Sequence, residues 1–230
     1  MRKFFRLPLQ IYYRLLLGRR VPGGARLARW ARALEARSGR GDLPLPRGAW
    51  EEQYRAGTWD YLEEPGELAR YGVVAAAVRR LRPGGTVLDV GCGEGLLAEH
   101  LGPDGCRRYL GIDLSAAAVS AAMRRTGPGA RPTARFAVAD ADDWPLRGTF
   151  DAVVLNECLY YLREPLEAAR RALAALRPGG ILVVSMFRTA RTRGLARLLA
   201  RELPLVEEVV LSSRRGAWIV GFYRAAERGA

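Results

Sequence analysis

Apolar residues along the chain fall into short continuous runs, and these runs alternate with longer segments of helical length. Runs such as VLDV, YLGI and ILVV are typical of buried strands. The strands predicted in this way are 86–90, 108–113, 133–138, 150–156, 181–187, about 206–212 and about 217–223. The predicted helices are 65–82, 95–102, 115–126, 164–176 and about 192–202, with Pro65 in a first turn and Ser115 as an N-cap.

The alternation of strands and helices predicts an α/β fold, in which a doubly wound and mostly parallel sheet is covered by helices on both faces. The phrase LRPGG occurs twice, at 81–85 and at 176–180, each time between a predicted helix and a predicted strand. Pro and Gly end helices and reverse the chain, so we expect a turn at both places.

The first 48 residues differ in pattern from the remainder. Residues 1–20 and 23–37 have helical patterns, and 38–48 (SGRGDLPLPRG) has the Gly and Pro content of a linker. The chain is therefore predicted to consist of a basic helical arm and linker, 1–48, and a main domain, 49–230.

The uneven distribution of charge along the chain supports this division into an arm and a main domain. The formal net charge is +13, and residues 1–41 hold Lys3 and ten arginines against one acid, Glu35, which gives +10 for the arm. Three uses of such an arm remain open: contact of residues 1–20 with an anionic membrane surface, packing on its own domain or on another copy, and binding of nucleic acid. The main domain is close to neutral, which argues against nucleic acid as its partner.

The small numbers of cysteine and histidine residues exclude further classes of site. Three widely spaced cysteines fit neither a disulfide framework nor a zinc site, which indicates a reducing, cytoplasmic compartment. His100 is the single histidine, so most histidine metal sites and a Ser-His-Asp triad are not expected, and no metal is predicted. The apolar part of residues 1–20 is short and interrupted by Arg14, unlike a signal peptide or a membrane span.

A glycine-rich loop follows the first predicted strand, in the segment VLDVGCGEG. A dinucleotide loop reads G-x-G-x-x-G, but here the third position of that pattern is Leu96. Glu94 would also repel a pyrophosphate at the start of the next helix. Asp113 ends the next strand about 20 residues later, where a carboxylate accepts ribose hydroxyls. A ribose without phosphate, carrying a charged tail, describes S-adenosylmethionine.

With the motifs VLDVGCGEG, GIDLS, VADADDWP, FDAVVLNECLYYL and LRPGGILVVS in this order, the chain resembles the class I S-adenosylmethionine-dependent methyltransferases over about residues 50–225. The resemblance implies a Rossmann-like, seven-stranded sheet whose last strand is antiparallel. It also implies a cofactor site that contains Asp89, Gly91, Cys92, Gly93 and Gly95 at the methionine part, Asp113 at the ribose, Leu114, Asp140 and Ala141 at the adenine, and Asn156 beside the methyl group.

A finer resemblance rests on LNECLYYL and on YRAGTW at 54–59, which are similar to the nodulation-factor N-methyltransferase subgroup. It implies methyl transfer to an N or O atom of a small molecule, for which a sugar or a glycolipid is one candidate. It also implies that Trp59 belongs to the cofactor site. Arg70 is expected either to bind the cofactor carboxylate or to be an ordinary helix-surface arginine.

Two residues are predicted to act on the acceptor. Glu157 follows a central strand, where it would take a proton or orient an amine, and Tyr160 lies close by, although packing is the commoner role of such a ring. The alternative function is a nucleic-acid methyltransferase or binding protein that uses the basic arm. Against it, strand 150–156 ends in NECL and not in the Asn/Asp-Pro-Pro-aromatic sequence used on base amines. The oligomeric state is not indicated.

Overall fold

The computed structural model of the chain describes residues 46–102, 104–127, 133–143, 149–214 and 216–226. The predicted helices within 1–20 and 23–37 lie outside these ranges. The strands are β1 (Thr86–Val90), β2 (Arg108–Asp113), β3 (Thr133–Val138), β4 (Phe150–Asn156), β5 (Leu176–Phe187), β6 (Leu205–Ser213) and β7 (Gly216–Arg224). The helices are α3 (Arg47–Arg55), α4 (Pro65–Leu81), α5 (Leu96–Leu101), α6 (Ala116–Thr126), α7 (Pro165–Ala174) and α8 (Ala190–Glu202), with short 3₁₀ helices η2 (Asp60–Glu63) and η3 (Leu159–Tyr161).

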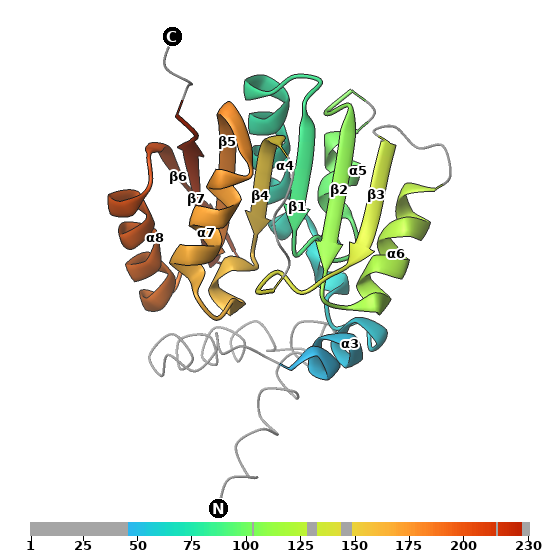
Figure 1. Cartoon of the computed structure of the whole chain (residues 1–230). Coiled ribbons are helices and arrows are strands. Elements are labelled where there is room, and N and C mark those ends of the chain that lie inside the picture. Colours follow the sequence, from blue (N-terminus) through green and yellow to red (C-terminus); the bar gives the residue numbers. More distant parts are fainter. Residues whose placement is uncertain (1–45, 103, 128–132, 144–148, 215, 227–230) are drawn as a thin grey trace, which may run out of the picture.

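These strands form one seven-stranded sheet in the order β3-β2-β1-β4-β5-β7-β6 (Figure 1). Strands β1 to β5 pair in parallel, and β7 is antiparallel to both of its neighbours. The predicted doubly wound fold, with its antiparallel last strand, is confirmed. The sheet order reverses direction between β1 and β4, and in open α/β sheets ligands bind beyond the carboxyl ends of the strands at such a point.

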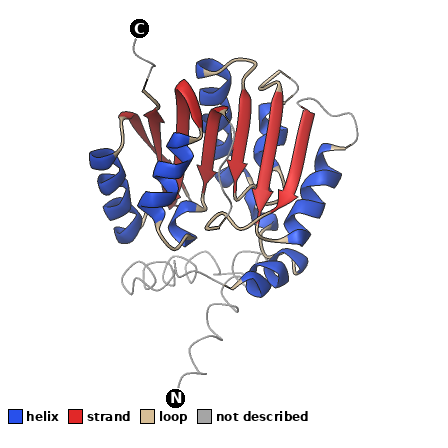
Figure 2. Cartoon of the chain, in the orientation of Figure 1, coloured by secondary structure: helices blue, strands red, loops and turns tan. Residues whose placement is uncertain are grey.

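Helices cover the sheet in two layers (Figure 2). Helices α4, α5 and α6 pack into one apolar core, and α7 and α8 pack into the other. All five residues of β1 are buried, because this central strand is covered from both sides. The run VLDV within β1 is mostly apolar, as expected for a strand that is buried on both faces, and it was one of the runs from which the strands were predicted.

The second LRPGG segment, at 176–180, was predicted to be a turn, but in the structure it forms the first part of a strand. Helix α7 ends at Ala174, and β5 already begins at Leu176, paired with Phe150. The register then shifts so that Ala152 pairs with Ile181, and the residues between leave the ladder. Gly84 and Gly179 nevertheless both have positive φ, 65° and 68°, so the two copies share a left-handed glycine.

Helix α3 lies beyond the carboxyl ends of the strands, next to the start of α6 (Figure 1). It begins at Arg47, so the predicted linker 38–48 is wrong over its last two residues. Glu51 of α3 accepts hydrogen bonds from the Ser115 hydroxyl at 2.7 Å and from the Ala117 amide at 3.1 Å. Ser115 itself caps α6, as predicted, by accepting from the Ala118 amide.

Candidate active site

The glycine loop lies between β1 and α5, and its three glycines have φ of +70°, +52° and +82° at Gly91, Gly93 and Gly95. Other residue types rarely adopt this left-handed region. The amides of Gly91 and Cys92 both donate to the Ile112 carbonyl, at 2.8 and 2.9 Å, so the loop folds back against the end of β2.

Close neighbours add a second reason for glycine at each place. A Cβ on Gly91 would lie 2.6 Å from the Cβ of Cys158, and one on Gly95 would lie 3.1 Å from the Cβ of Ala122. A Cβ on Gly93 would lie 3.0 Å from the Tyr54 hydroxyl. The protein's own packing therefore requires glycine at all three positions.

Asp113 holds this loop and the next turn together. One carboxylate oxygen accepts from the Gly93 amide and the other from the Ser115 amide, both at 2.9 Å. Burial raises the pKa of Asp113, although these backbone bonds oppose the change. Each oxygen retains a lone pair for a further donor, as the predicted ribose contact requires. Leu114, predicted at the adenine, is half-buried beside it.

Asp89 is a buried carboxyl group at the end of β1, with 2% of its surface exposed. Its Oδ2 accepts from the Tyr109 hydroxyl, but its Oδ1 has no hydrogen-bond partner among the described residues. Burial raises the pKa of Asp89 to about 7. A buried acceptor of this kind is costly unless a donor reaches it, so it is a fitting contact for a cationic ligand group.

Arg70 is buried in α4, with 1% of its surface exposed, so the helix-surface alternative is wrong. Its Nη1 donates to Oδ1 of Asn156 at 2.7 Å, and its Nη2 lies 3.4 Å from Glu67 Oε2. The guanidinium also lies 4.4 Å from the centre of the Tyr71 ring. Its Nε has no partner among the described residues. The predicted contact with the cofactor carboxylate stays a prediction.

A hydrogen-bond network runs from Asn156 to Tyr160 at the end of β4. The Ser185 hydroxyl lies 2.8 Å from Asn156 Oδ1 and 3.0 Å from Glu157 Oε1. The other oxygen of Glu157 accepts from the Tyr160 hydroxyl at 2.8 Å and from the Phe187 amide at 3.0 Å. Glu157 therefore positions Tyr160, and both its oxygens are engaged.

Glu157 is also the one residue other than glycine with positive φ among the described residues, at 60°. This backbone conformation costs free energy for a residue with a side chain and persists where surrounding contacts enforce it. Here the enforcing contacts are the amide of Glu157, which donates to the Ser185 carbonyl at 3.0 Å, and the carboxylate network. The pairing of strain with a polar network marks this strand end as a functional candidate.

The predicted adenine residues follow β3. The Ala139 amide donates to the Asp113 carbonyl at 2.9 Å, which places the end of β3 beside the end of β2. Asp140 Oδ1 accepts from the Asp142 amide at 2.9 Å, and the Ala141 carbonyl accepts from Arg171 at 2.9 Å. These bonds fix the loop that carries both residues on the same edge of the sheet as Asp113.

Aromatic residues of α3 and the following turn lie on this edge. Trp59 stacks on Trp50 with ring centres 5.8 Å apart, and the Tyr54 ring centre lies 6.2 Å from that of Trp59. Trp50 also contacts Tyr161 edge-on at 4.9 Å, which joins α3 to η3. Sequence reasoning selected Trp59 but missed Tyr54 and Ser185. Tyr54 stood in the motif YRAGTW, whereas Ser185 lay in an apolar strand and gave no signal.

These contacts bring the glycine loop, Asp89, Asp113 and the Asn156 network to one edge of the sheet, the edge beyond which α3 lies (Figure 1). Comparison with known proteins identifies the arrangement, because a family described as "Methyltransferase domain" matches residues 59–213. The chain belongs to this methyltransferase family. The family confirms the predicted class I methyltransferase domain, with S-adenosylmethionine as its methyl donor.

Two curated methyltransferases match part of this chain. A ubiquinone biosynthesis O-methyltransferase from Xanthomonas campestris is 32% identical over 154 residues, which cover 62% of this chain and 64% of that protein. A 2-methyl-6-phytyl-1,4-hydroquinone methyltransferase from Synechocystis is 40% identical over 106 residues, covering 46% of this chain and 33% of that protein. The matches thus span less than two thirds of these relatives.

Solved structures share the fold. N-methyltransferase NodS from Bradyrhizobium japonicum, in complex with S-adenosyl-L-homocysteine, aligns with a TM-score of 0.66 and 24% identity over 79% of this chain and 98% of that chain. A 1,6-didemethyltoxoflavin-N1-methyltransferase from Burkholderia thailandensis aligns with a TM-score of 0.62 and 22% identity over 79% and 87%. The likeness to NodS agrees with the resemblance found in the motifs.

In the part of this methyltransferase that the structure describes, none of the helices has the length and apolar character needed to span a bilayer.

Proposed function

We propose that this methyltransferase transfers a methyl group from S-adenosylmethionine to a small-molecule acceptor, at a nitrogen or oxygen atom. The observation that carries the proposal is the buried Asp89 Oδ1, which has no donor among the described residues and belongs to a residue of β1 two positions before the glycine loop. The cofactor has a cationic amino group in its methionine part, and this group would supply the missing donor and the opposite charge.

The other residues of this edge fit the cofactor as well. Asp113 retains an acceptor lone pair on each oxygen for the ribose hydroxyls, and Arg70 is held in place by Asn156 and Glu67. When bound, S-adenosylmethionine supplies an activated methyl group, so the protein has to align the reactants and exclude water. The aromatic residues Trp50 and Trp59 lie where they would exclude water from this edge.

The Glu157 network bears on the choice of acceptor. A hydroxyl acceptor would need a general base, and Glu157 was the carboxylate nominated for that role. Its Oε2 already accepts hydrogen bonds from the Tyr160 hydroxyl and the Phe187 amide, and its Oε1 shares the single proton of the Ser185 hydroxyl with Asn156 Oδ1. We therefore assign Glu157 to positioning, and we favour an amine acceptor, which needs only to be neutral. An amino sugar, free or as part of a glycolipid, satisfies this requirement and agrees with the motif resemblance.

The test is transfer of labelled methyl from S-adenosylmethionine into a panel of amino sugars, glycolipids, small amines, phenols or alcohols of similar size, and duplex and single-stranded nucleic acids. We expect labelling of at least one amine and weaker labelling of the matched alcohols. Labelling confined to alcohols or phenols would overturn the amine assignment while leaving methyl transfer intact. Labelling of a nucleic acid and of no small molecule would support the alternative function.

A further inference from the structure

Helix α3 contacts both of the residues whose amides hold the carboxylate of Asp113. Those amides belong to Gly93, which donates to one oxygen, and to Ser115, which donates to the other. The Tyr54 hydroxyl lies against Gly93, where a Cβ would be 3.0 Å away. Burial raises the pKa of Tyr54, and the nearby Asp113 carboxylate raises it further. One turn earlier on α3, Glu51 Oε2 accepts from the Ser115 hydroxyl at 2.7 Å.

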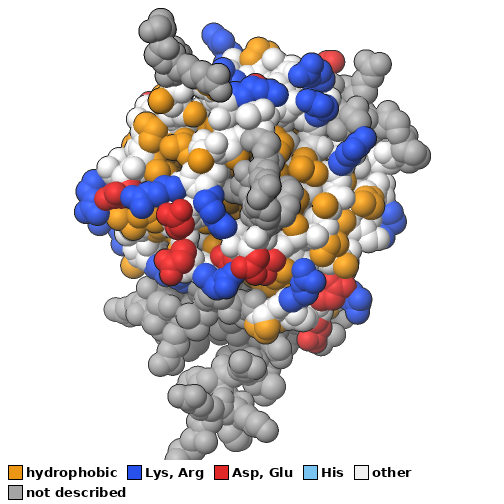
Figure 3. Space-filling model, in the orientation of Figure 1, with side chains coloured by type: hydrophobic (Ala, Val, Ile, Leu, Met, Phe, Trp, Pro, Cys, Tyr) orange, Lys and Arg blue, Asp and Glu red, His pale blue; other side chains and the backbone are white. Residues whose placement is uncertain are grey.

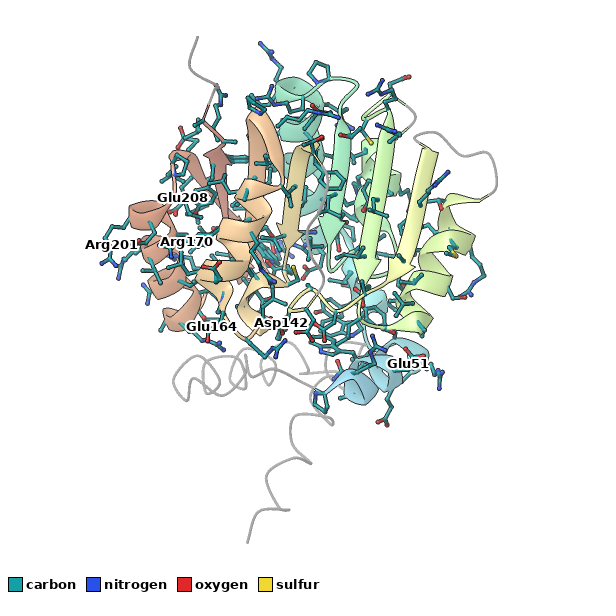
Figure 4. All side chains as sticks on the ribbon, viewed as in Figure 1. Glu51, Asp142, Glu164, Arg170, Arg201 and Glu208 are labelled. Carbon is teal, nitrogen blue, oxygen red and sulfur yellow. The ribbon has the colours of Figure 1, made fainter. Side chains whose placement is uncertain are left out.

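Glu51 forms more than this one bond with α6. Figure 4 labels Glu51 on α3, beyond the carboxyl ends of the strands. Its Oε2 also accepts from the Ala117 amide at 3.1 Å, and amides in the first turn of a helix have no acceptor within that helix. The pKa of Glu51 is lowered, chiefly by the hydrogen bond from Ser115. The donors at the start of α6 therefore favour Glu51 as a charged carboxylate, as a helix N-terminus does.

The rest of α3 is attached to the domain only loosely. None of the residues of α3 is buried. Acidic and basic side chains gather at the surface around this helix (Figure 3). Aromatic contacts, such as that of Trp50 with Tyr161 at 4.9 Å, also join α3 to the domain. A segment with few buried apolar contacts opens at a small cost in free energy, so each polar bond of α3 has a large effect on its position.

We infer that Glu51 is a positioning residue for the cofactor. By fastening α3 to the start of α6, it keeps Gly93 and Ser115 in the places from which their amides hold Asp113. The inference rests on the proposed contact between Asp113 and the ribose. It adds that the docking of α3 and the binding of the cofactor depend on each other. Because such coupling is reciprocal, the bound cofactor stabilises the docked helix by the same factor by which the docked helix strengthens cofactor binding.

The experiment compares three variants of the full chain. Glu51→Ala removes the carboxylate that bonds with α6, and Glu51→Gln keeps an oxygen that can accept from the same donors. Glu52→Ala is the matched control, because it removes an identical side chain from the next position of α3. The side chain of Glu52 is exposed and forms no ion pair within the described ranges of the chain.

Three measurements are made on each variant. Calorimetric titration with S-adenosylhomocysteine gives the affinity. Hydrogen exchange of the α3 amides, with and without this ligand, reports how far the helix is docked. Urea unfolding reports the stability of the whole domain. None of these measurements depends on which acceptor is methylated, so they separate this inference from the choice of acceptor.

Glu51→Ala should bind S-adenosylhomocysteine at least about fivefold more weakly than the wild type, while Glu51→Gln should recover most of this loss. Glu52→Ala should bind within about twofold of the wild type. The ligand should slow exchange of the α3 amides in the wild type and in Glu52→Ala, and this slowing should be at least about fivefold smaller in Glu51→Ala.

Three outcomes would overturn the inference about Glu51. The first is a Glu51→Ala protein whose affinity and ligand-dependent exchange equal those of the wild type. The second is an equal loss in Glu52→Ala, which would show a general effect of substitutions in α3. The third is a Glu51→Ala protein that has lost its fold, since Glu51 would then support the whole domain. A wild type that does not bind S-adenosylhomocysteine would refute the cofactor site itself, and this inference with it.

Discussion

Replacing Asp89 with Asn should separate stability from cofactor binding. Asn has the same shape and keeps an oxygen that accepts from Tyr109, while it removes a charge that has no partner on Oδ1. The substitution is therefore expected to stabilise the free protein above neutral pH. It is expected at the same time to weaken binding of S-adenosylhomocysteine, because the cationic amino group of the ligand loses its counter-charge.

The magnitude follows from the pKa of Asp89, which rises from 3.8 to about 7 on folding. A rise of about 3 pH units at about 1.4 kcal/mol per unit gives a penalty of about 4 kcal/mol for keeping Asp89 ionised in the free protein. Because the folded pKa is raised, the stability contributed by the protonated form is complete below pH 4 and is lost as the pH rises through about 7.

The assay is urea unfolding of free wild-type and Asp89→Asn protein at pH 5 and pH 8, with calorimetric titration of S-adenosylhomocysteine at pH 8. The stability of the variant relative to the wild type should increase from pH 5 to pH 8, with the variant up to about 4 kcal/mol more stable at the higher pH. Its affinity should fall at least tenfold. A variant that is less stable than the wild type at pH 8, or that binds the ligand equally well, would refute this assignment of Asp89.

Three further predictions concern the same edge. Asp113→Ala should weaken S-adenosylhomocysteine binding by about 1.5–3 kcal/mol in calorimetry, because acceptor bonds to the ribose are lost, and unchanged affinity would contradict the ribose assignment. Gly91→Ala should lower the free energy of unfolding by about 2–4 kcal/mol in denaturant titration, from positive φ and the clash with Cys158, and a neutral effect would show that the loop relaxes. Glu157→Gln should lower kcat by less than about tenfold if it positions Tyr160, whereas a loss of about a hundredfold or more would restore the general base.

The sheet could be predicted from sequence because its signals are local. Continuous apolar runs mark strands buried on both faces, and Ser115 is a capping residue beside the helix that it caps. The second LRPGG was misjudged, because pairing of Leu176 with Phe150 outweighs the local tendency of Pro and Gly to form a turn. A strand partner 26 positions away is not visible in a five-residue pattern.

The candidate site could be predicted only where a motif carried it. Asp89, Asp113 and the glycines stand in ordered motifs at the ends of strands, and the structure brings these ends to one edge. The network around Glu157 could not be predicted, because Ser185 is one polar residue in a buried strand and bonds with residues 28 and 29 positions away. The burial of Arg70 likewise depends on Asn156, which lies 86 positions along the chain.

The central claim is that this edge of the sheet binds S-adenosylmethionine and not a dinucleotide. Calorimetric titration of the full chain with S-adenosylhomocysteine, and separately with NAD, tests it most directly. We predict saturable binding of S-adenosylhomocysteine at one site per chain and no response to NAD. Binding of NAD, with no heat from S-adenosylhomocysteine, would contradict the account.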